Sequence, residues 1–204
     1  TARLTYFDNR MKNPVFNVTI TPGTLAQKQN IPKTRVYGVQ SDVEYALTRD
    51  LSVSGAYLYD VGKVTEGTGL TAPLVGKYIA QVPKNRGSFD IVYSNLKYAR
   101  VAFGVQFIGA QYDDDLNARG VPINGCPVTA VNSPSLNCIG IGTPGLPGYH
   151  TFDLSASRQI LRNFEVFFGI QNLADEVYYV QTNPSTVGTP RLVTGGVRVK
   201  WNGR

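Results

Sequence analysis

The stretch Tyr37-Gly-Val-Gln-Ser-Asp-Val-Glu-Tyr-Ala-Leu47 determines the fold class, because apolar and polar residues alternate along it. Side chains of a β-strand point alternately to its two faces, so a period of two predicts a strand with one apolar and one polar face. The apolar face holds Tyr37, Val39, Val43, Tyr45 and Leu47 and is interrupted only by Ser41; the polar face holds Gln40, Asp42 and Glu44.

The same alternation recurs along the whole chain and predicts eight strands. They lie near residues 1–9, 36–47, 51–60, 88–93, 101–107, 152–157, from 164 onward and 193–201. Each has one apolar face. We expect Val39, Val105, Leu154 and Val197 to face lipid, and Gln40, Gln106, Ser155 and Arg198 to face the interior of a barrel.

The connections between the predicted strands alternate between tight turns and long loops. Tight turns are expected at Arg49-Asp50, 95–97 and 161–163, and long polar loops near 10–33, 61–86, 113–147 and 181–190. Several strands reach the length of about 10 residues that a tilted strand needs to cross a bilayer. Short turns at one end, long loops at the other and one apolar face per strand are typical of an outer-membrane β-barrel.

Composition excludes other classes of protein. Among 204 residues, 17% are charged, and the net charge of +6 comes from basic residues spread singly along the chain. No run of the type that binds nucleic acid is present. No apolar stretch approaches the roughly 18 residues of a membrane helix. A soluble β-sandwich remains an alternative, because its core also takes aromatic residues.

Aromatic residues are expected in two belts where the apolar band meets the lipid headgroups. One belt, near the short turns, holds Tyr45, Tyr93, Tyr98, Phe164 and Trp201, and the other, near the long loops, holds Tyr57, Tyr59, Tyr112, Phe152 and Tyr178.

Residues for catalysis or metal binding are sparse. His150 is the only histidine, and although Asp153 and Ser155 follow it, strand alternation accounts for their polarity. Asp113-Asp-Asp115 suggests either a calcium loop or, more simply, a solvated loop tip. We therefore expect no enzyme activity, no metal site and no cofactor.

Several segments, in order and over about 170 residues, resemble the C-terminal part of the barrel of TonB-dependent outer-membrane receptors. The segments are Arg35-Val-Tyr-Gly-Val-Gln40, Leu74-Val-Gly-Lys77, Gln81-Val-Pro-Lys84, 148–157, 164–179 with its Asn172-Leu-Ala-Asp175, Gly188-Thr-Pro-Arg191 and 195–201. Gln40 stands where the family usually has an acidic residue.

The resemblance implies an all-β, antiparallel transmembrane barrel of about 22 strands around a plug. Residues 1–204 would supply about eight of these strands, without the plug, as an open curved sheet. The implied function is uptake of a ferric siderophore, cobalamin or similar large nutrient across the outer membrane, energised through TonB. The implied partners are outer-membrane lipid, the rest of the barrel and plug, the TonB complex and a nutrient such as a metal chelate, but not nucleic acid. A self-contained eight-stranded barrel with a structural or adhesion role is the alternative.

Two sets of residues are candidates for roles within this framework. Polar residues expected to line the nutrient path are Asp42, Glu44, Asp90, Gln106, Gln171 and Arg198. Cys126 and Cys138 are the only cysteines, and both fall in the longest loop, which the barrel topology places outside the cell. We expect them to form a disulfide, with two free thiols as the alternative.

Overall fold

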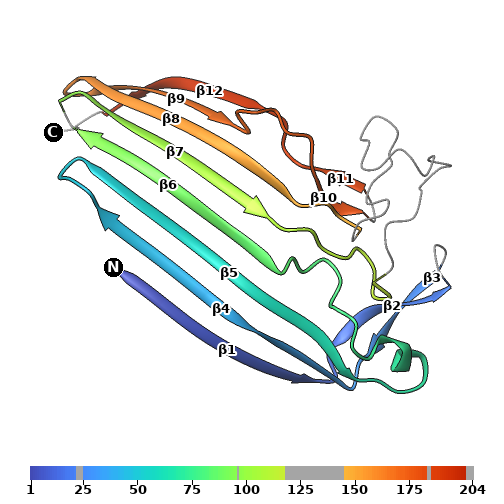
Figure 1. Ribbon diagram of the computed structural model, residues 1–204. Coiled ribbons are helices and arrows are strands. Elements are labelled where there is room, and N and C mark those ends of the chain that lie inside the picture. The colour runs from blue at the N-terminus through green and yellow to red at the C-terminus, as the bar shows by residue number, and fades with distance from the viewer. Residues whose placement is uncertain (22–24, 96, 118–144, 183–184, 201–204) are drawn as a thin grey trace.

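Eight antiparallel strands form one sheet in the computed structural model, which describes residues 1–21, 25–95, 97–117, 145–182 and 185–200. The sheet order is β1-β4-β5-β6-β7-β8-β9-β12 (Figure 1). The strands are β1 (Ala2–Lys12), β4 (Lys33–Ala46), β5 (Leu51–Glu66), β6 (Asn85–Asn95), β7 (Ala99–Ile108), β8 (Tyr149–Leu161), β9 (Phe164–Gln171) and β12 (Leu192–Val199). The all-β prediction and the eight expected strands are confirmed.

The register of the strands aligns the apolar positions into continuous rows. Phe89 of β6 pairs with Val105 of β7, which pairs with Phe152 of β8. Such cross-strand pairs of aromatic and β-branched residues stabilise a sheet. Gly38 marks a close approach in β4, because a Cβ atom there would lie 2.0 Å from the carbonyl oxygen of Tyr59 on β5.

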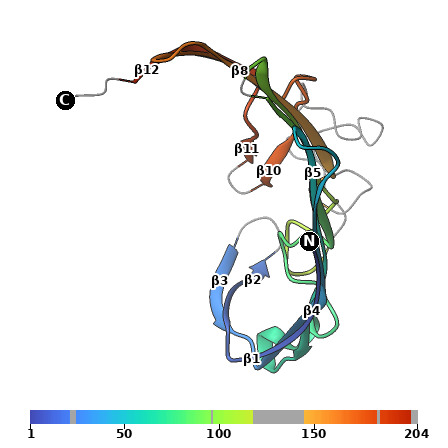
Figure 2. The same cartoon turned by 90° about the vertical axis from the view of Figure 1, so that its left-hand side faces the viewer.

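The sheet is curved and open, as predicted. β1 pairs only with β4 and β12 only with β9, so the two edges of the eight-stranded sheet do not meet within the described residues. Figure 2, which looks along the strands, shows the sheet as an arc with β1 and β12 at its two ends. A closed eight-stranded barrel is therefore not the structure of this chain.

Short and long connections alternate along the chain, as expected. The short connections after β4, β6 and β8 join neighbouring strands at one end of the sheet, and long connections lie at the other. The side-chain amide of Asn95 donates to the Asp50 carboxylate over 2.5 Å, which links two of the short turns.

Three of the predicted loops contain regular structure. Residues 13–32 include a hairpin of β2 (Val15–Thr21) and β3 (Leu25–Asn30), residues 67–84 include the 3₁₀ helix η1 (Gly69–Leu74), and residues 172–191 include a hairpin of β10 (Tyr179–Thr182) and β11 (Ser185–Val187). The expectation of irregular loops there was wrong. Both hairpins lie on the concave side of the sheet (Figure 2).

The packing of the β2–β3 hairpin explains why it is ordered. Val18 of β2 is buried with Ile31, Val64 and Leu74, so apolar residues from four separate segments form a small core at the long-loop end. Thr19 adds polar contacts, since its backbone N–H donates to the Asp115 carboxylate over 2.8 Å. The hairpin is thus fixed to the wall rather than free in solvent.

No helix in the part of the chain that the structure describes is long and apolar enough to span a membrane.

Candidate functional site

The polar face of the sheet is its concave face. Val64 of β5 packs against Val18 of the β2–β3 hairpin, which lies on the concave side. Side chains two, four or more positions away along a regular strand share its face. On β5, Ser54 therefore shares the concave face with Val64. On β4, Thr34 pairs with Val64, so Asp42 and Glu44, which share the face of Thr34, also lie on the concave face.

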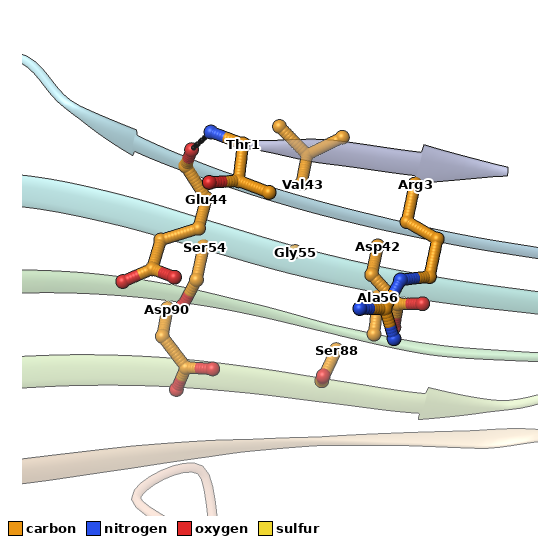
Figure 3. A pocket seen from close by; sticks show the side chains of 10 residues that line it. All are labelled: Thr1, Arg3, Asp42, Val43, Glu44, Ser54, Gly55, Ala56, Ser88 and Asp90. Atoms are coloured by element: carbon orange, nitrogen blue, oxygen red, sulfur yellow. Dashed lines mark hydrogen bonds between the residues drawn. The ribbon is translucent and has the colours of Figure 1, made fainter.

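Three of the predicted site residues meet in one open hollow of about 350 Å³ on this concave wall. Glu44, Ser54 and Asp90 stand in a single row across β4, β5 and β6, because Glu44 pairs with Ser54 and Ser54 with Asp90. Asp42 occupies the next row on β4. Figure 3 shows the carboxylates of Glu44 and Asp90 on either side of Ser54.

The hollow has an excess of negative charge. Its lining contains three carboxylates, those of Asp42, Glu44 and Asp90, and one guanidinium, that of Arg3, which lies directly across from Asp42 in the β1–β4 register. Gln40 donates to the Asp42 carboxylate over 3.1 Å. Such a surface accepts hydrogen bonds from hydroxyl, amide or ammonium groups. The described residues contain no group of three or more side chains arranged to hold a bare metal ion.

Gln106 lines a second hollow, of about 260 Å³, that continues from the first. The two hollows share Asp42, Ala56 and Ser88, and Gln40 and Arg86 complete the polar lining of the second. The wall from Glu44 to Gln106 is therefore one connected polar track along the concave face.

The other two path candidates lie apart from this track. Arg198 is paired with Glu165 across β12 and β9, with 2.9 Å between Nη1 and Oε2, and the pair lines a separate hollow with Arg100. Gln171 ends β9 and pairs with Leu192 of β12. Sequence reasoning assigned these residues to one path, but the structure brings together only Asp42, Glu44, Asp90 and Gln106.

Asp60 is a polar residue of the concave face that the sequence pattern did not single out. It is 7% exposed, Arg86 approaches its Oδ2 to 3.9 Å, and its Oδ1 has no hydrogen-bond partner. The alternation of the sequence already placed Asp60 on the polar face, but its burial could not be predicted from the sequence.

The remaining candidates do not form a reactive centre. His150 is on the opposite strand face from Asp153 and Ser155, and its ring packs edge-on against Phe152 at 5.4 Å. Asp153 accepts instead from the backbone N–H of Asn172 over 2.9 Å. Cys126 and Cys138 lie outside the described residues, so their disulfide stays a prediction.

The Asn172-Leu-Ala-Asp175 motif fixes the chain where β9 ends. Asn172 is buried and adopts a left-handed φ of 50°, and its side-chain amide donates to the carbonyls of Glu176 and Thr189 over 2.8 and 3.1 Å. Asp175 accepts from the backbone N–H and the guanidinium of Arg191, both at 3.0 Å. These bonds, the backbone one foremost, lower the pKa of Asp175 below its ordinary value. The motif is structural and joins the two ends of the β10–β11 connection.

Comparison with solved structures finds the same sheet in much larger proteins. The siderophore receptor PiuA from Acinetobacter baumannii superposes with a TM-score of 0.70 at 18% identity, covering 98% of this chain and 26% of that one. The ferric yersiniabactin uptake receptor FyuA from Yersinia pestis gives 0.72 at 14% identity, covering 98% and 27%. The copper transporter OprC gives 0.67 at 16% identity, covering 97% and 28%. The chain thus spans about a quarter of each.

A search of curated proteins finds no significant match. The family model described as "TonB dependent receptor-like, beta-barrel" matches residues 1–173. That match covers most of the chain, including every strand from β1 to β9, and the family consists of transport receptors rather than enzymes. The chain belongs to the β-barrel family of TonB-dependent receptors.

Proposed function

We propose that this chain is the C-terminal portion of the barrel of an outer-membrane receptor that takes up a ferric siderophore, cobalamin or similar large nutrient, with energy supplied through TonB. The single observation that carries the proposal is the open sheet with an apolar convex face and a polar concave wall, in a chain of this family. In lipid each unpaired backbone group costs several kcal/mol. The free edges of β1 and β12 therefore favour further strands on both sides.

The polar track from Glu44 to Gln106 would form part of the interior wall, facing a plug and the nutrient's route. Carboxylates and amides spaced along one face offer several separate hydrogen-bonding groups in two open hollows. Such a surface suits a large polar ligand, or a plug, that has to be released as well as bound. The β2–β3 and β10–β11 hairpins, at the long-loop end, would narrow the extracellular mouth.

The solved relatives guide the choice of nutrient. PiuA is named as a siderophore receptor, FyuA as a ferric yersiniabactin uptake receptor and OprC as a copper transporter. A metal chelate is therefore the first class to test, and the acidic hollow predicts a ligand with donor groups on its surface.

Growth under iron limitation tests this function. The gene that encodes this chain would be deleted in its own host, and growth compared on single ferric siderophores and, separately, on limiting cobalamin. We expect growth to be lost on at least one of these sources, to return with a plasmid copy, and to fail again when TonB is absent. Unchanged growth and unchanged uptake of labelled nutrient on every source would refute the proposal.

A triple variant tests the role of the hollow. Asp42→Asn, Glu44→Gln and Asp90→Asn together remove the three carboxylates and keep the shape of the side chains. A matched triple, Asp113→Asn, Asp114→Asn and Glu176→Gln, removes the same charge from the connections at the long-loop end. Slower uptake in the first triple alone would support the polar track, whereas equal rates in both would exclude it.

A further inference from the structure

An unusual arrangement of charge lies on the convex face, at the long-loop end of β1, β4 and β5. Arg10 is directly opposite Arg35 in the β1–β4 register, and Arg35 is directly opposite Lys63 in the β4–β5 register. Like charges directly across a sheet repel each other and destabilise it. In the next row Lys12 is opposite Lys33. We call these five residues the basic patch.

Carboxylates neutralise only part of the basic patch. Asp8 accepts two hydrogen bonds from the Arg35 guanidinium, at 2.8 and 2.7 Å, and lies 3.7 Å from Arg10. Glu66 pairs with Lys33 at 2.6 Å. Only these two carboxylates form ion pairs with the five cations of the basic patch among the described residues, and the Arg10 side chain remains 75% exposed. The patch keeps a surplus of accessible positive charge.

Lys84, in the connection after β5, adds a further cation beside the patch, and Lys63 and Lys84 both contact Tyr78. The ammonium groups of Lys84 and Lys63 lie 3.9 and 4.6 Å from the centre of the Tyr78 ring. A hydrogen bond from Lys84, together with the charges of both lysines, lowers the pKa of Tyr78 below its ordinary value. The positive field therefore extends beyond the strands into the connection after β5.

The patch lies directly above the apolar wall on the same face. From Val43 toward the long-loop end of β4, the convex face presents Ser41 flanked by Leu4 and Tyr57, and then Val39 flanked by Tyr6 and Tyr59. The next row holds Tyr37 with Asp8 and Val61, and the cations follow. Arg35 lies 4.7 Å over the Tyr37 ring. Apolar residues, tyrosines and cations in that order match the acyl chains, interface and charged headgroups of one membrane leaflet.

We propose that the basic patch binds the phosphate groups of an outer-leaflet lipid headgroup. Arginine and lysine are the side chains that bind phosphate most strongly, arginine through two parallel hydrogen bonds. The tyrosines below the patch place these donors at headgroup depth, where a phosphate anchored by acyl chains meets them. The inference depends on insertion in an outer membrane and is independent of which nutrient the receptor carries.

Binding of lipid A by the receptor in an uncharged detergent tests the proposal. The whole outer-membrane protein that carries this chain would be titrated with fluorescent bisphosphorylated lipid A and with its dephosphorylated form. We expect the dephosphorylated form to bind at least fivefold more weakly. Equal binding of the two lipids would overturn the proposal without any variant. Displacement of the lipid by millimolar inorganic phosphate, beyond the effect of chloride at equal ionic strength, would assign the patch to a free anion and overturn the lipid assignment.

A matched pair of triple variants locates the site. Arg10→Gln, Lys33→Gln and Lys63→Gln together should weaken binding of bisphosphorylated lipid A at least fivefold and leave Arg35 bound to Asp8. The control triple, Arg49→Gln, Lys97→Gln and Arg162→Gln, removes the same charge at the short-turn end and should bind within twofold of the parent. Equal loss in both triples, or none in the first, would overturn the assignment, provided circular dichroism shows both to be folded.

Discussion

The strongest test of the two-faced sheet is to place one charge on each face of the same strand. Val105 and Gln106 are consecutive in β7, so their side chains point to opposite faces. Val105 lies between Phe89 and Phe152 on the neighbouring strands, whereas Gln106 lines the polar track with Asp42. We predict that Val105→Arg destabilises the receptor and that Gln106→Arg leaves its stability nearly unchanged.

The position of Val105 sets the size of the effect. Phe107 is two residues from Val105 along β7 and lies in the same cross-strand row as Tyr57. Val101 is four residues from Val105 in the other direction and pairs with Tyr93. At about 3.4 Å per residue, Val105 therefore lies roughly 7 and 14 Å from these tyrosine-bearing rows. An arginine on the lipid face near mid-bilayer costs about 2 to 4 kcal/mol, a change of roughly 30- to 900-fold in the folding equilibrium. The same residue at Gln106 keeps its charge in water beside a carboxylate, so we expect a loss below about 1 kcal/mol.

Reversible refolding of the whole receptor into lipid vesicles, followed by denaturant titration, measures both losses. The parent and Val105→Ala serve as controls, the latter because it removes side-chain volume without adding charge. Equal losses for the two arginine variants would mean that both faces have the same surroundings. That result would refute the assignment of the convex face to lipid.

Three further predictions concern single positions or pairs of residues. Cys126 and Cys138 should stay joined in a non-reducing digest, and peptides that separate without reductant would exclude the disulfide. The pKa of Asp175 is lowered in the folded protein, so its contribution to stability is present above the unfolded value of 3.8 and is lost as pH falls through the lower, folded value. The protection factors of residues 172–182 and 185–191, which compare their exchange with that of the unfolded chain at the same pH, should therefore decrease below about pH 4, and less so in Asp175→Asn. Gly38→Ala should cost about 3 kcal/mol or more because its Cβ meets a backbone oxygen, whereas Gly55→Ala, with no atom closer than 3.6 Å, should cost little in the same denaturant titration.

The sequence predicts the strands well because their information is local. An alternation of apolar and polar residues over eight or more positions, as in 37–47, identifies a strand without knowledge of the strands that pair with it. The β2–β3 hairpin was missed although Phe16, Val18 and Ile20 alternate with polar residues, because its strands are short and lie in a polar region. Its order depends on Ile31, Val64 and Leu74, whose proximity only the folded chain shows.

The sequence predicts which residues belong to the candidate site, but it does not predict which of them lie next to one another. Alternation identified Glu44, Asp90 and Gln106 as residues of the polar face. Which of them become neighbours depends on strand register, which the geometry of a short turn such as 47–50 helps to set. Arg198 satisfied the same pattern, but its ion pair with Glu165 and its place near the other edge of the sheet separate it from the rest.

The order of strands in the sheet also has a consequence for how the chain folds. Every strand from β4 to β8 pairs with the strand that follows it in sequence, whereas β1 joins β4 and β9 joins β12 across segments that form their own hairpins. Each pairing therefore closes a modest loop, and the entropy lost in closing a loop grows only slowly with its length. Assembly can proceed one hairpin at a time, each new strand adding to an edge already formed. In a larger barrel, the first and last strands are the only neighbours that lie far apart in the sequence. Their pairing would then be the last step of assembly and would limit its rate.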